Sequence, residues 1–257
     1  MQKPSGEFLQ SFARGLSVIR AFGPHSPVMT LTAVAEKTGL TRAGARRILL
    51  TLQSLGYVAC EGRDFRLTPR ILDLGYSYLS SMPLWDVAQP IMEDLVAEVH
   101  ESCSASVLEG EDVVYVLRVP THRIMTVGLS IGSRLPAYAT SMGRVLLGSL
   151  TESELDAYFA RAKLSAFTRR TVTDAKLLRK TILADAKKGW SLVDQELEDG
   201  LRSISVPIFD GRGRIIAAMN ISGQAARTSE AQIVRNFLPR LKDAADRIGA
   251  SLRLRRG

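Results

Sequence analysis

Cysteine and histidine are scarce in this chain of 257 residues. Its two cysteines, Cys60 and Cys103, are too few for a disulfide framework or for a cysteine-bound zinc site. Among its three histidines, His100 and His122 have no metal-binding spacing and no nucleophile that a motif links to them. We therefore predict no metal site, no cofactor and no catalytic residue in this protein.

Long apolar runs are missing as well. No N-terminal segment resembles a signal peptide, and no run of about 18 apolar residues could span a membrane. The chain has neither a glycine-rich phosphate loop of the Walker type nor an internal repeat. We therefore expect a cytoplasmic protein with no membrane partner.

Acidic residues cluster where Asp194, Glu196, Glu198 and Asp199 stand within six residues. A general acid and base pair among them is one alternative. A run of acids between two strands is more often a solvated loop, and we interpret this cluster as such a loop. The sequence thus predicts that the protein is not an enzyme.

Positive charge is unevenly distributed. The chain carries 34 lysines and arginines against 26 acidic residues, a net charge of +8, and residues 1–70 hold ten of the former against four of the latter. A hydrophobic content of 46% supports a packed core, and the length favours two domains. The charge excess in the first 70 residues indicates a polyanionic partner such as double-stranded DNA.

The segment 31–56, LTAVAEKTGLTRAGARRILLTLQSLG, has the pattern of two short helices joined by a turn. Thr41 is a suitable N-cap, Gly39 suits the turn, and Gly56 suits a left-handed residue that ends the second helix. Apolar residues recur at helical spacing on one side of each helix, namely Leu31, Val34 and Ala35, then Ala45, Ile48, Leu49, Leu52 and Leu55. This pattern predicts a helix-turn-helix, in which the second helix enters the major groove by its N-terminal end.

A β-hairpin is predicted directly behind the second helix. Residues 57–60 and 65–67 alternate in polarity around the turn 61–64. An ordinary helical hairpin with a solvated charged face is the alternative for residues 31–56 alone, but the added hairpin favours a winged helix-turn-helix. Its predicted DNA contacts are Thr41, Arg42, Ala43, Arg46 and Arg47 from the second helix and Arg63 and Arg66 from the wing.

Two further helices flank this segment. A helix capped by Ser11 would place Phe12, Leu16, Ile19 and Phe22 in a three-helix core. A second helix, opened by Pro69, is apolar on several sides, so we expect it to act as a linker and to pair protomers. We therefore divide the chain into a winged helix-turn-helix domain (1–68), a linker helix (69–82) and a C-terminal domain (83–257).

The C-terminal domain mixes helices and strands. Pro90 is expected to open one helix, others are expected at 140–150 and after the caps Thr151 and Asp174, and a last one runs from Ser229. Extended segments are expected at 104–108, 113–119, 125–129, 135–138, 190–193, 201–209 and 214–222. This order predicts an α+β fold in which one antiparallel sheet is flanked by helices.

Four segments together resemble the IclR family of bacterial transcription regulators: LTAVAEKTGLTRAGARRILLTLQSLGYV, FRLTPRILDLGYSYL, IGSRLPAYATSMGRVLLGSL and DQELEDGLRSISVPIFDGRGRIIAAMNISG. The resemblance covers essentially the whole chain from Ser11. It implies a C-terminal domain related to the GAF fold, and a homodimer that can pair into a dimer of dimers. Arg144 stands where the family usually has lysine, and Ser203 stands where it has a cysteine or a small residue.

The third and fourth segments are most similar to the branch of the family that regulates the β-ketoadipate pathway. Members of that branch respond to protocatechuate, para-hydroxybenzoate or related aromatic acids. The resemblance therefore implies a sequence-specific regulator of aromatic acid catabolism genes that binds a pseudopalindromic operator and is controlled by a small carboxylic acid. Three alternatives stay open: an aliphatic acid as the effector, a small-molecule-processing enzyme with a dimerising winged domain, and a nucleoid-type DNA binder without an effector.

The family's effector pocket, carried over by motif, implies Ser141, Met142, Leu201, Ser203, Asn220 and Ser222. Backbone N–H groups at the start of the helix 140–150 would suit a carboxylate, and Val127, Met142 and Leu201 would form apolar walls. Arg134 adjoins these motifs and is a candidate partner of the carboxylate, with Arg118, Arg123 and Arg202 as further arginines of this kind. The alternative for the polar residues is local hydrogen bonding within strands and turns.

Overall fold

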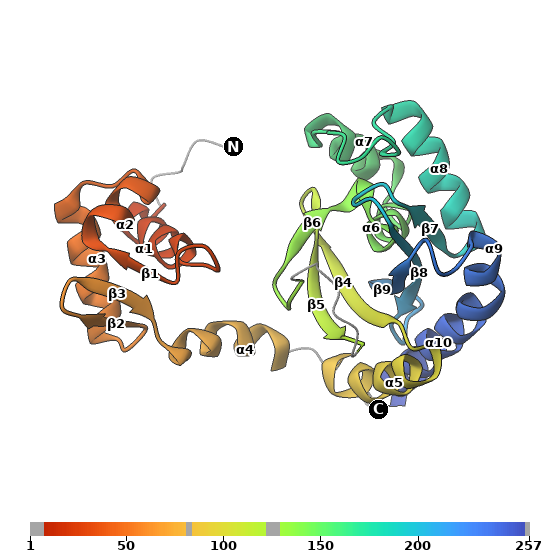
Figure 1. The fold of residues 1–257 in the computed structure, drawn as a ribbon, viewed down its shortest axis with the longest axis horizontal. Coiled ribbons are helices and arrows are strands. Elements are labelled where there is room, and N and C mark those ends of the chain that lie inside the picture. Colours follow the sequence, from red (N-terminus) through yellow and green to blue (C-terminus); the bar gives the residue numbers. More distant parts are fainter. Residues whose placement is uncertain (1–7, 81–83, 122–128, 255–257) are drawn as a thin grey trace. The chain divides into compact units, whose positions relative to one another are not determined.

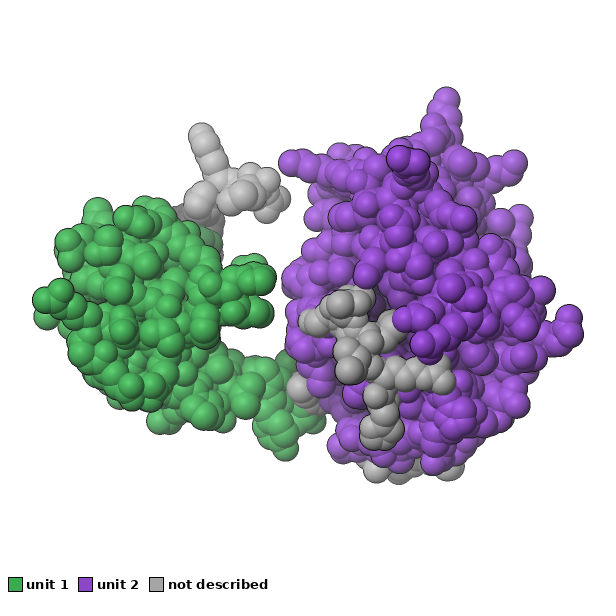
Figure 2. Space-filling view, in the orientation of Figure 1, with its two compact units in different colours: residues 1–81 green, residues 82–257 purple. Residues whose placement is uncertain are grey.

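The computed structural model describes residues 8–80, 84–121 and 129–254. The chain divides into two compact units, residues 1–81 and residues 82–257, which Figure 2 colours separately. Each unit contains its own hydrophobic core. In the described part of the chain, no helix has the length and hydropathy that a membrane crossing requires.

The first unit is a winged helix-turn-helix (Figure 1). Its elements are α1 (Gln10–Ala21), β1 (Val28–Thr30), α2 (Leu31–Thr38), α3 (Arg42–Ser54), β2 (Val58–Glu61) and β3 (Asp64–Leu67). The Thr41 hydroxyl accepts the Gly44 N–H at 3.1 Å and caps α3, while Gly39 ends α2 in the left-handed conformation. The core between the helices includes Val18, Val34, Ala45, Leu49 and Leu52. The predicted architecture of this unit is confirmed.

The wing has a third strand that the sequence did not reveal. β1 pairs antiparallel with β3, so the strand order is β1-β3-β2. Of the three residues of β1, only Met29 is buried, and it lies opposite Phe65 in the core. An alternation of three residues is too short to indicate a strand without knowledge of its partner.

The prediction for α1 is correct for two of its four core residues: Phe22 is buried in the core and Ile19 packs against it, whereas Phe12 and Leu16 do not. Phe12 and Leu16 are 68% and 42% exposed, whereas Val18 and Ala21 are buried. Two neighbouring stripes of this helix are apolar, and contact with α2 and α3 selects the one that contains the small Ala21. The N-cap is Leu9, not Ser11. The Phe12 stripe is consequently left on the surface of this unit.

The linker segment begins with one 3-10 turn, Pro69–Ile71, and continues as α4 (Leu72–Ser80). Proline occupies the first position of the turn, where its missing N–H leaves no hydrogen bond unmade. Leu72, Leu74 and Tyr76 on this segment are between 49% and 70% exposed. Exposed apolar residues are typical of contact surfaces, and the pairing of protomers through this helix stays a prediction.

The second unit is built on one six-stranded antiparallel sheet. Its strands are β4 (Ser102–Glu109), β5 (Asp112–Val119), β6 (Arg134–Pro136), β7 (Ser191–Asp194), β8 (Leu201–Phe209) and β9 (Ile215–Gln224). They follow the order β6-β5-β4-β9-β8-β7, and neighbouring strands are antiparallel throughout. Of the predicted extended segments, 125–129 lies outside the described residues except for its last residue. The predicted α+β class is confirmed.

Helices cover both faces of this sheet (Figure 1). On one face, α5 (Leu84–Val99) and α10 (Leu238–Leu254) pack against each other and against the central strands. On the other face lies α6 (Ser141–Leu147), with α8 (Ala175–Lys188) packed against it. The remaining helical segments are Ala137–Ala139, α7 (Glu152–Arg161), α9 (Glu230–Gln232) and a π-helical turn, Ile233–Phe237.

α5 begins earlier than predicted. It starts at Leu84 and contains Pro90 in its interior, instead of being opened by that proline. Leu84 and Trp85 are buried, as is Leu95 further along the helix. Burial of the first apolar turn outweighs the hydrogen bond that Pro90 cannot donate, a loss of about 3 kcal/mol in an isolated helix.

Asp210 fixes the hairpin between β8 and β9. Its Oδ1 accepts the N–H groups of Arg212 at 2.8 Å and Arg214 at 3.0 Å, and its Oδ2 accepts from Nε and Nη2 of Arg214 at 2.9 and 2.7 Å. The backbone bond from Arg214 and that residue's guanidinium lower the pKa of Asp210 to about 2, against the opposing effect of burial. The ionised carboxylate therefore stabilises this end of the sheet.

We expect Asp210→Asn to lower the free energy of unfolding at pH 7. The pKa of Asp210 is about 2 in the folded state, and that of an unfolded aspartate is about 3.9. The contribution of the carboxylate is therefore complete above about pH 4 and is lost as the pH falls toward 2. Urea unfolding at several pH values should show the gap between wild type and variant shrinking over this range. Asp246→Asn, at an exposed site, is the control, and a gap that does not vary with pH would contradict the assignment.

Candidate functional site

A small cavity lies in the second unit between the sheet and α6. Its volume is about 30 Å³, which holds about one or two water molecules. The described residues that line it are Tyr115, Ala139, Thr140, Ser141, Val193, Leu197, Leu201, Ser203, Asn220 and Ser222. A larger ligand therefore needs these side chains to move apart.

Strand register brings the polar members of this set together. Ser203 on β8 lies opposite Ser222 on β9, and Asn220 is two residues from Ser222 on the same face of that strand. Ser141 is the first residue of α6, which packs on β8 and β9. Four polar side chains from three elements thus meet at the cavity.

These four side chains form one continuous hydrogen-bonded chain. The Asn220 amide donates to the hydroxyls of Ser203 and Ser222, each at 2.9 Å, and the Ser222 hydroxyl donates to Ser203 at 3.1 Å. The Ser104 N–H donates to Asn220 Oδ1 at 3.1 Å, which fixes the orientation of the amide. The hydroxyl oxygens of Ser203 and Ser141 are 2.8 Å apart.

The direction of the last bond follows from the capacity of each group. A hydroxyl donates one hydrogen bond and accepts two. Ser203 already accepts from Asn220 and Ser222, so its proton goes to Ser141. The proton of Ser141 is then available to the cavity, where it suits an oxygen acceptor of a ligand.

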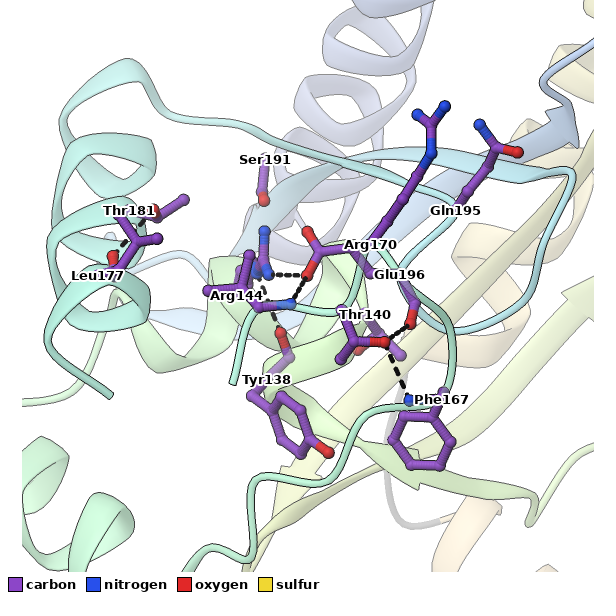
Figure 3. Close-up of polar contacts among 12 residues, drawn as sticks. Tyr138, Thr140, Arg144, Phe167, Arg170, Leu177, Thr181, Ser191, Gln195 and Glu196 are labelled. Atoms are coloured by element: carbon purple, nitrogen blue, oxygen red, sulfur yellow. Dashed lines mark hydrogen bonds and ion pairs between the residues drawn. The ribbon is translucent and has the colours of Figure 1, made fainter. Parts of the chain in front are cut away.

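A buried ion pair holds one wall of this cavity (Figure 3). Arg144 on α6 donates from Nη2 to Glu196 Oε2 at 2.7 Å and from Nε to the Tyr138 carbonyl at 3.0 Å. The side chains of Arg144 and Glu196 are only 3% and 9% exposed. Glu196 Oε2 also accepts the Val172 N–H at 2.9 Å. Because Leu197 lines the cavity, this ion pair fastens the cavity wall to α6.

The prediction of a solvated acidic loop is therefore wrong for Asp194 and Glu196, whereas Glu198 and Asp199 are exposed. Glu196 is buried, and Asp194 accepts from Arg202 at 2.6 Å and from Arg170 at 2.5 Å. Burial raises the pKa of Asp194, but the hydrogen bond and charge of Arg202 lower it by more, so that it lies below its ordinary value. Ion pairs with Arg144, Arg170 and Arg202 offset the cost of burying Glu196 and part of Asp194. Arg202, one of the candidate partners of the ligand carboxylate, is therefore already paired.

Five residues predicted for the effector site line the cavity: Ser141, Leu201, Ser203, Asn220 and Ser222. Met142 does not line it; this side chain is fully buried under α6, and its sulfur accepts the Ser106 hydroxyl at 3.3 Å. Val127 lies outside the described residues. The sequence reasoning missed the other five lining residues, although Ala139 and Thr140 directly precede a predicted one.

Two further predictions for this site find no support in the geometry. Arg134 lies on β6 and pairs with Glu109 at 2.8 Å and Asp112 at 3.2 Å, outside the cavity lining. The helix expected over 140–150 spans only Ser141–Leu147, and the Thr140 hydroxyl already accepts the N–H of its third residue at 3.1 Å. The cap satisfies one of the N–H groups at that helix end, and an anion site there stays a prediction.

The predicted DNA-contacting residues of α3 share one exposed surface. Arg42, Ala43, Arg46 and Arg47 are exposed, while Ala45 on the opposite side lies in the core. No ion pair among the described residues includes these three arginines, so their charges are free to meet phosphate or base edges. On the wing, Arg63 is exposed in the turn, and Arg66 pairs with Glu61 at 2.6 Å.

Two family models match the chain. The IclR helix-turn-helix domain matches residues 11–61, and the bacterial transcriptional regulator IclR C-terminal domain matches residues 76–250. The first match covers most of the winged unit, and the second covers the sheet and the cavity. The resemblance noted in the sequence is confirmed.

Relatives that span nearly the whole chain are transcriptional regulators. The Pca regulon regulatory protein of Pseudomonas putida is 43% identical over 240 residues, which is 93% of this chain and 82% of that protein. The p-hydroxybenzoate hydroxylase transcriptional activator of Acinetobacter baylyi is 35% identical over 247 residues, 94% of this chain and 91% of that protein. These relatives confirm the prediction of a regulator and set the enzyme alternative aside.

The fold is shared with a solved structure. An IclR homologue from Microbacterium hydrocarbonoxydans, crystallised with 4-hydroxybenzoate, has a TM-score of 0.85 and 24% identity, covering 95% of this chain and 100% of that one. At this level of identity the match supports the arrangement of helices and strands described above.

We expect Arg144→Met to lower the free energy of unfolding by about 3–5 kcal/mol, because it leaves the buried carboxylate of Glu196 without its cation. Arg161→Met is the matched control, since Arg161 pairs with Glu111 at the surface and such pairs contribute about 1 kcal/mol or less. Urea unfolding of both variants measures the difference. Equal losses would show that the Arg144–Glu196 pair has no special role in stability.

Proposed function

Because this chain belongs to the IclR family of bacterial transcriptional regulators, we propose that it controls genes of aromatic acid catabolism in response to a small carboxylic acid bound in the cavity under α6. The observation that carries this proposal is the hydrogen-bonded chain from Asn220 to Ser141, which leaves one hydroxyl proton for a ligand. The names of the Pseudomonas and Acinetobacter relatives supply the metabolic context.

The walls of the cavity suit an apolar body with polar ends. Val193, Leu197 and Leu201 supply aliphatic surface, and Tyr115 supplies an aromatic ring. A ligand site of this kind combines apolar walls with a few placed polar groups. The homologue of the same fold that was crystallised with 4-hydroxybenzoate adds support for an aromatic acid.

An aliphatic acid is the second candidate, and the size of the cavity favours it. A volume of about 30 Å³ is closer to what a two- or three-carbon acid needs than to the space around a benzene ring. An aromatic effector would have to push α6 or the segment around Leu197 outward. That displacement is also how a ligand could favour one arrangement of the protein over another, which an effector must do.

DNA binding is assigned to α3 and the wing of the first unit. Arg42, Arg46 and Arg47 would meet the major groove, and Arg63 would meet phosphate. We further propose a homodimer, or a dimer of dimers, that covers the exposed apolar residues of α1 and α4. A two-fold dimer would bind a pseudopalindromic operator.

Arg46→Ala should weaken operator binding at least tenfold while effector binding is retained, because the residue lies only on the proposed DNA surface. Fluorescence anisotropy at several salt concentrations checks this, and the salt dependence should also fall by about one phosphate contact if Arg46 meets the backbone. Arg235→Ala is the control, since Arg235 is exposed in the second unit. Unchanged operator affinity for Arg46→Ala would place the DNA surface elsewhere.

Ser203→Val should weaken effector binding tenfold or more, because it removes the hydroxyl on which the hydrogen-bonded chain converges. Ser205→Val is a matched control: Ser205 lies two residues away on the same strand face, is buried, and its hydroxyl has no partner among the described residues. Calorimetric titration with 4-hydroxybenzoate, protocatechuate and pyruvate measures both variants against wild type.

The outcome of the wild-type titration decides between the two candidate ligands. Binding of an aromatic acid supports the main proposal, and binding of pyruvate alone supports the aliphatic alternative. If Ser203→Val and Ser205→Val bind equally well, the effector site is not this cavity.

A further inference from the structure

Arg118 lies on β5 beside the polar cluster under α6. Its Nη1 donates to Ser104 Oγ at 3.2 Å, and Ser104 donates its backbone N–H to Asn220 Oδ1 at 3.1 Å. In the sheet, Arg118 is opposite Ser104, and Ser104 is opposite Asn220. Directly opposite residues point to the same face, so this row of three residues lies on the cavity side of the sheet.

A β-bulge places Arg118 on the same face as Tyr115, which lines the cavity. Tyr115 is paired with Ser106, but Leu117 is paired with Ala105, so β5 contains one extra residue between the two pairs. Without the bulge, residues 115 and 118 would point to opposite faces. Burial raises the pKa of Tyr115 to about 12, and the positive charge of Arg118 opposes this rise, as expected of neighbouring groups.

Arg118 differs from three other arginines in and beside this sheet, because their charges are neutralised by carboxylates. Arg134 and Arg202 in the sheet, and Arg214 in the hairpin before β9, each pair with a carboxylate within 3.2 Å. No ion pair of the described residues includes Arg118, which is partly buried and contacts the neutral hydroxyl of Ser104. A guanidinium stays charged at all ordinary pH values and has five donors, so Arg118 keeps capacity for an anion.

We propose that Arg118 binds the carboxylate of the effector, opposite the neutral cluster around Ser203. This inference rests on the function proposed above and names the charged group of that site. Adjacent strands are about 4.8 Å apart, so the three strand spacings from β5 to β8 separate the two ends by about 14 Å between backbones. The arginine side chain spans part of this distance. A ligand that reaches both ends carries a carboxylate at one end and a second oxygen at the other, as a hydroxybenzoate does.

The test compares an acid with its neutral amide. Full-length wild type, Arg118→Gln and Arg118→Lys are titrated calorimetrically with 4-hydroxybenzoate and with 4-hydroxybenzamide. Arg134→Gln is the control, because Arg134 is an arginine of the same sheet whose charge is already paired. We expect Arg118→Gln to weaken binding of the acid by on the order of 30-fold or more and binding of the amide by less than about threefold. Arg118→Lys keeps the charge and should lose less, and Arg134→Gln should match wild type.

Two results would overturn the role of Arg118 alone: unchanged binding of the acid to Arg118→Gln, or equal losses for acid and amide, which indicate a structural role. If wild type binds pyruvate instead, the same proteins are compared with pyruvate and pyruvamide under the same criteria. If Arg118→Gln does not fold, the acid-specific loss in Arg118→Lys decides. A wild type that binds none of these acids overturns the proposed effector function together with this inference.

Discussion

Hydrogen bonding of the polar groups under α6 is the constraint on which the second unit depends. A buried hydroxyl or amide without a hydrogen-bond partner costs about 1–3 kcal/mol. This face of the sheet carries several buried hydroxyl and amide groups, so most of them must find partners within the protein. Asn220 joins Ser203, Ser222 and the backbone of Ser104 into one network. Gly143, the third residue of α6, lets the helix pack closely on the turn before it, because a Cβ there would lie 2.0 Å from the Ala137 carbonyl oxygen. The cavity lies where Ser141 of α6 meets this network.

The acidic side chains next to the cavity are neutralised by ion pairs with arginines of other elements. Arg144 pairs with Glu196, and Arg202 pairs with Asp194, so the two less exposed of the four acids in the adjoining segment have arginine partners. These pairs fasten the segment that carries Leu197, and they leave no unpaired carboxylate at that wall among the residues described. A site lined by neutral donors repels an anion less than one lined by carboxylates, and a single cation such as Arg118 is then enough to select an acid.

The two units carry different candidate binding surfaces. The first unit presents arginines on the outer side of α3, which its apolar side anchors in the core. The second unit holds the cavity, and its sheet carries ion pairs instead of free cations, with Arg118 as the exception argued above. The concentration of positive charge in the first 70 residues, visible in the sequence, reflects this division. The exposed apolar residues of α1 and α4 are the surfaces that the proposed dimer would cover.

The sequence by itself determined the features that depend on residues close together in the chain. The caps Thr41 and Asp174, the glycines that end helices and the apolar periodicity of α3 predicted the helix-turn-helix and much of the α+β order, because these signals act within a few residues. The resemblance to a family supplied five lining residues of the cavity. Only the tertiary structure decided which stripe of α1 is buried, that Pro90 lies inside a helix, and that Arg144 meets Glu196. It also decided that Tyr115 and Arg118 share a face, because a bulge depends on the neighbouring strand and a buried ion pair depends on two segments 52 residues apart.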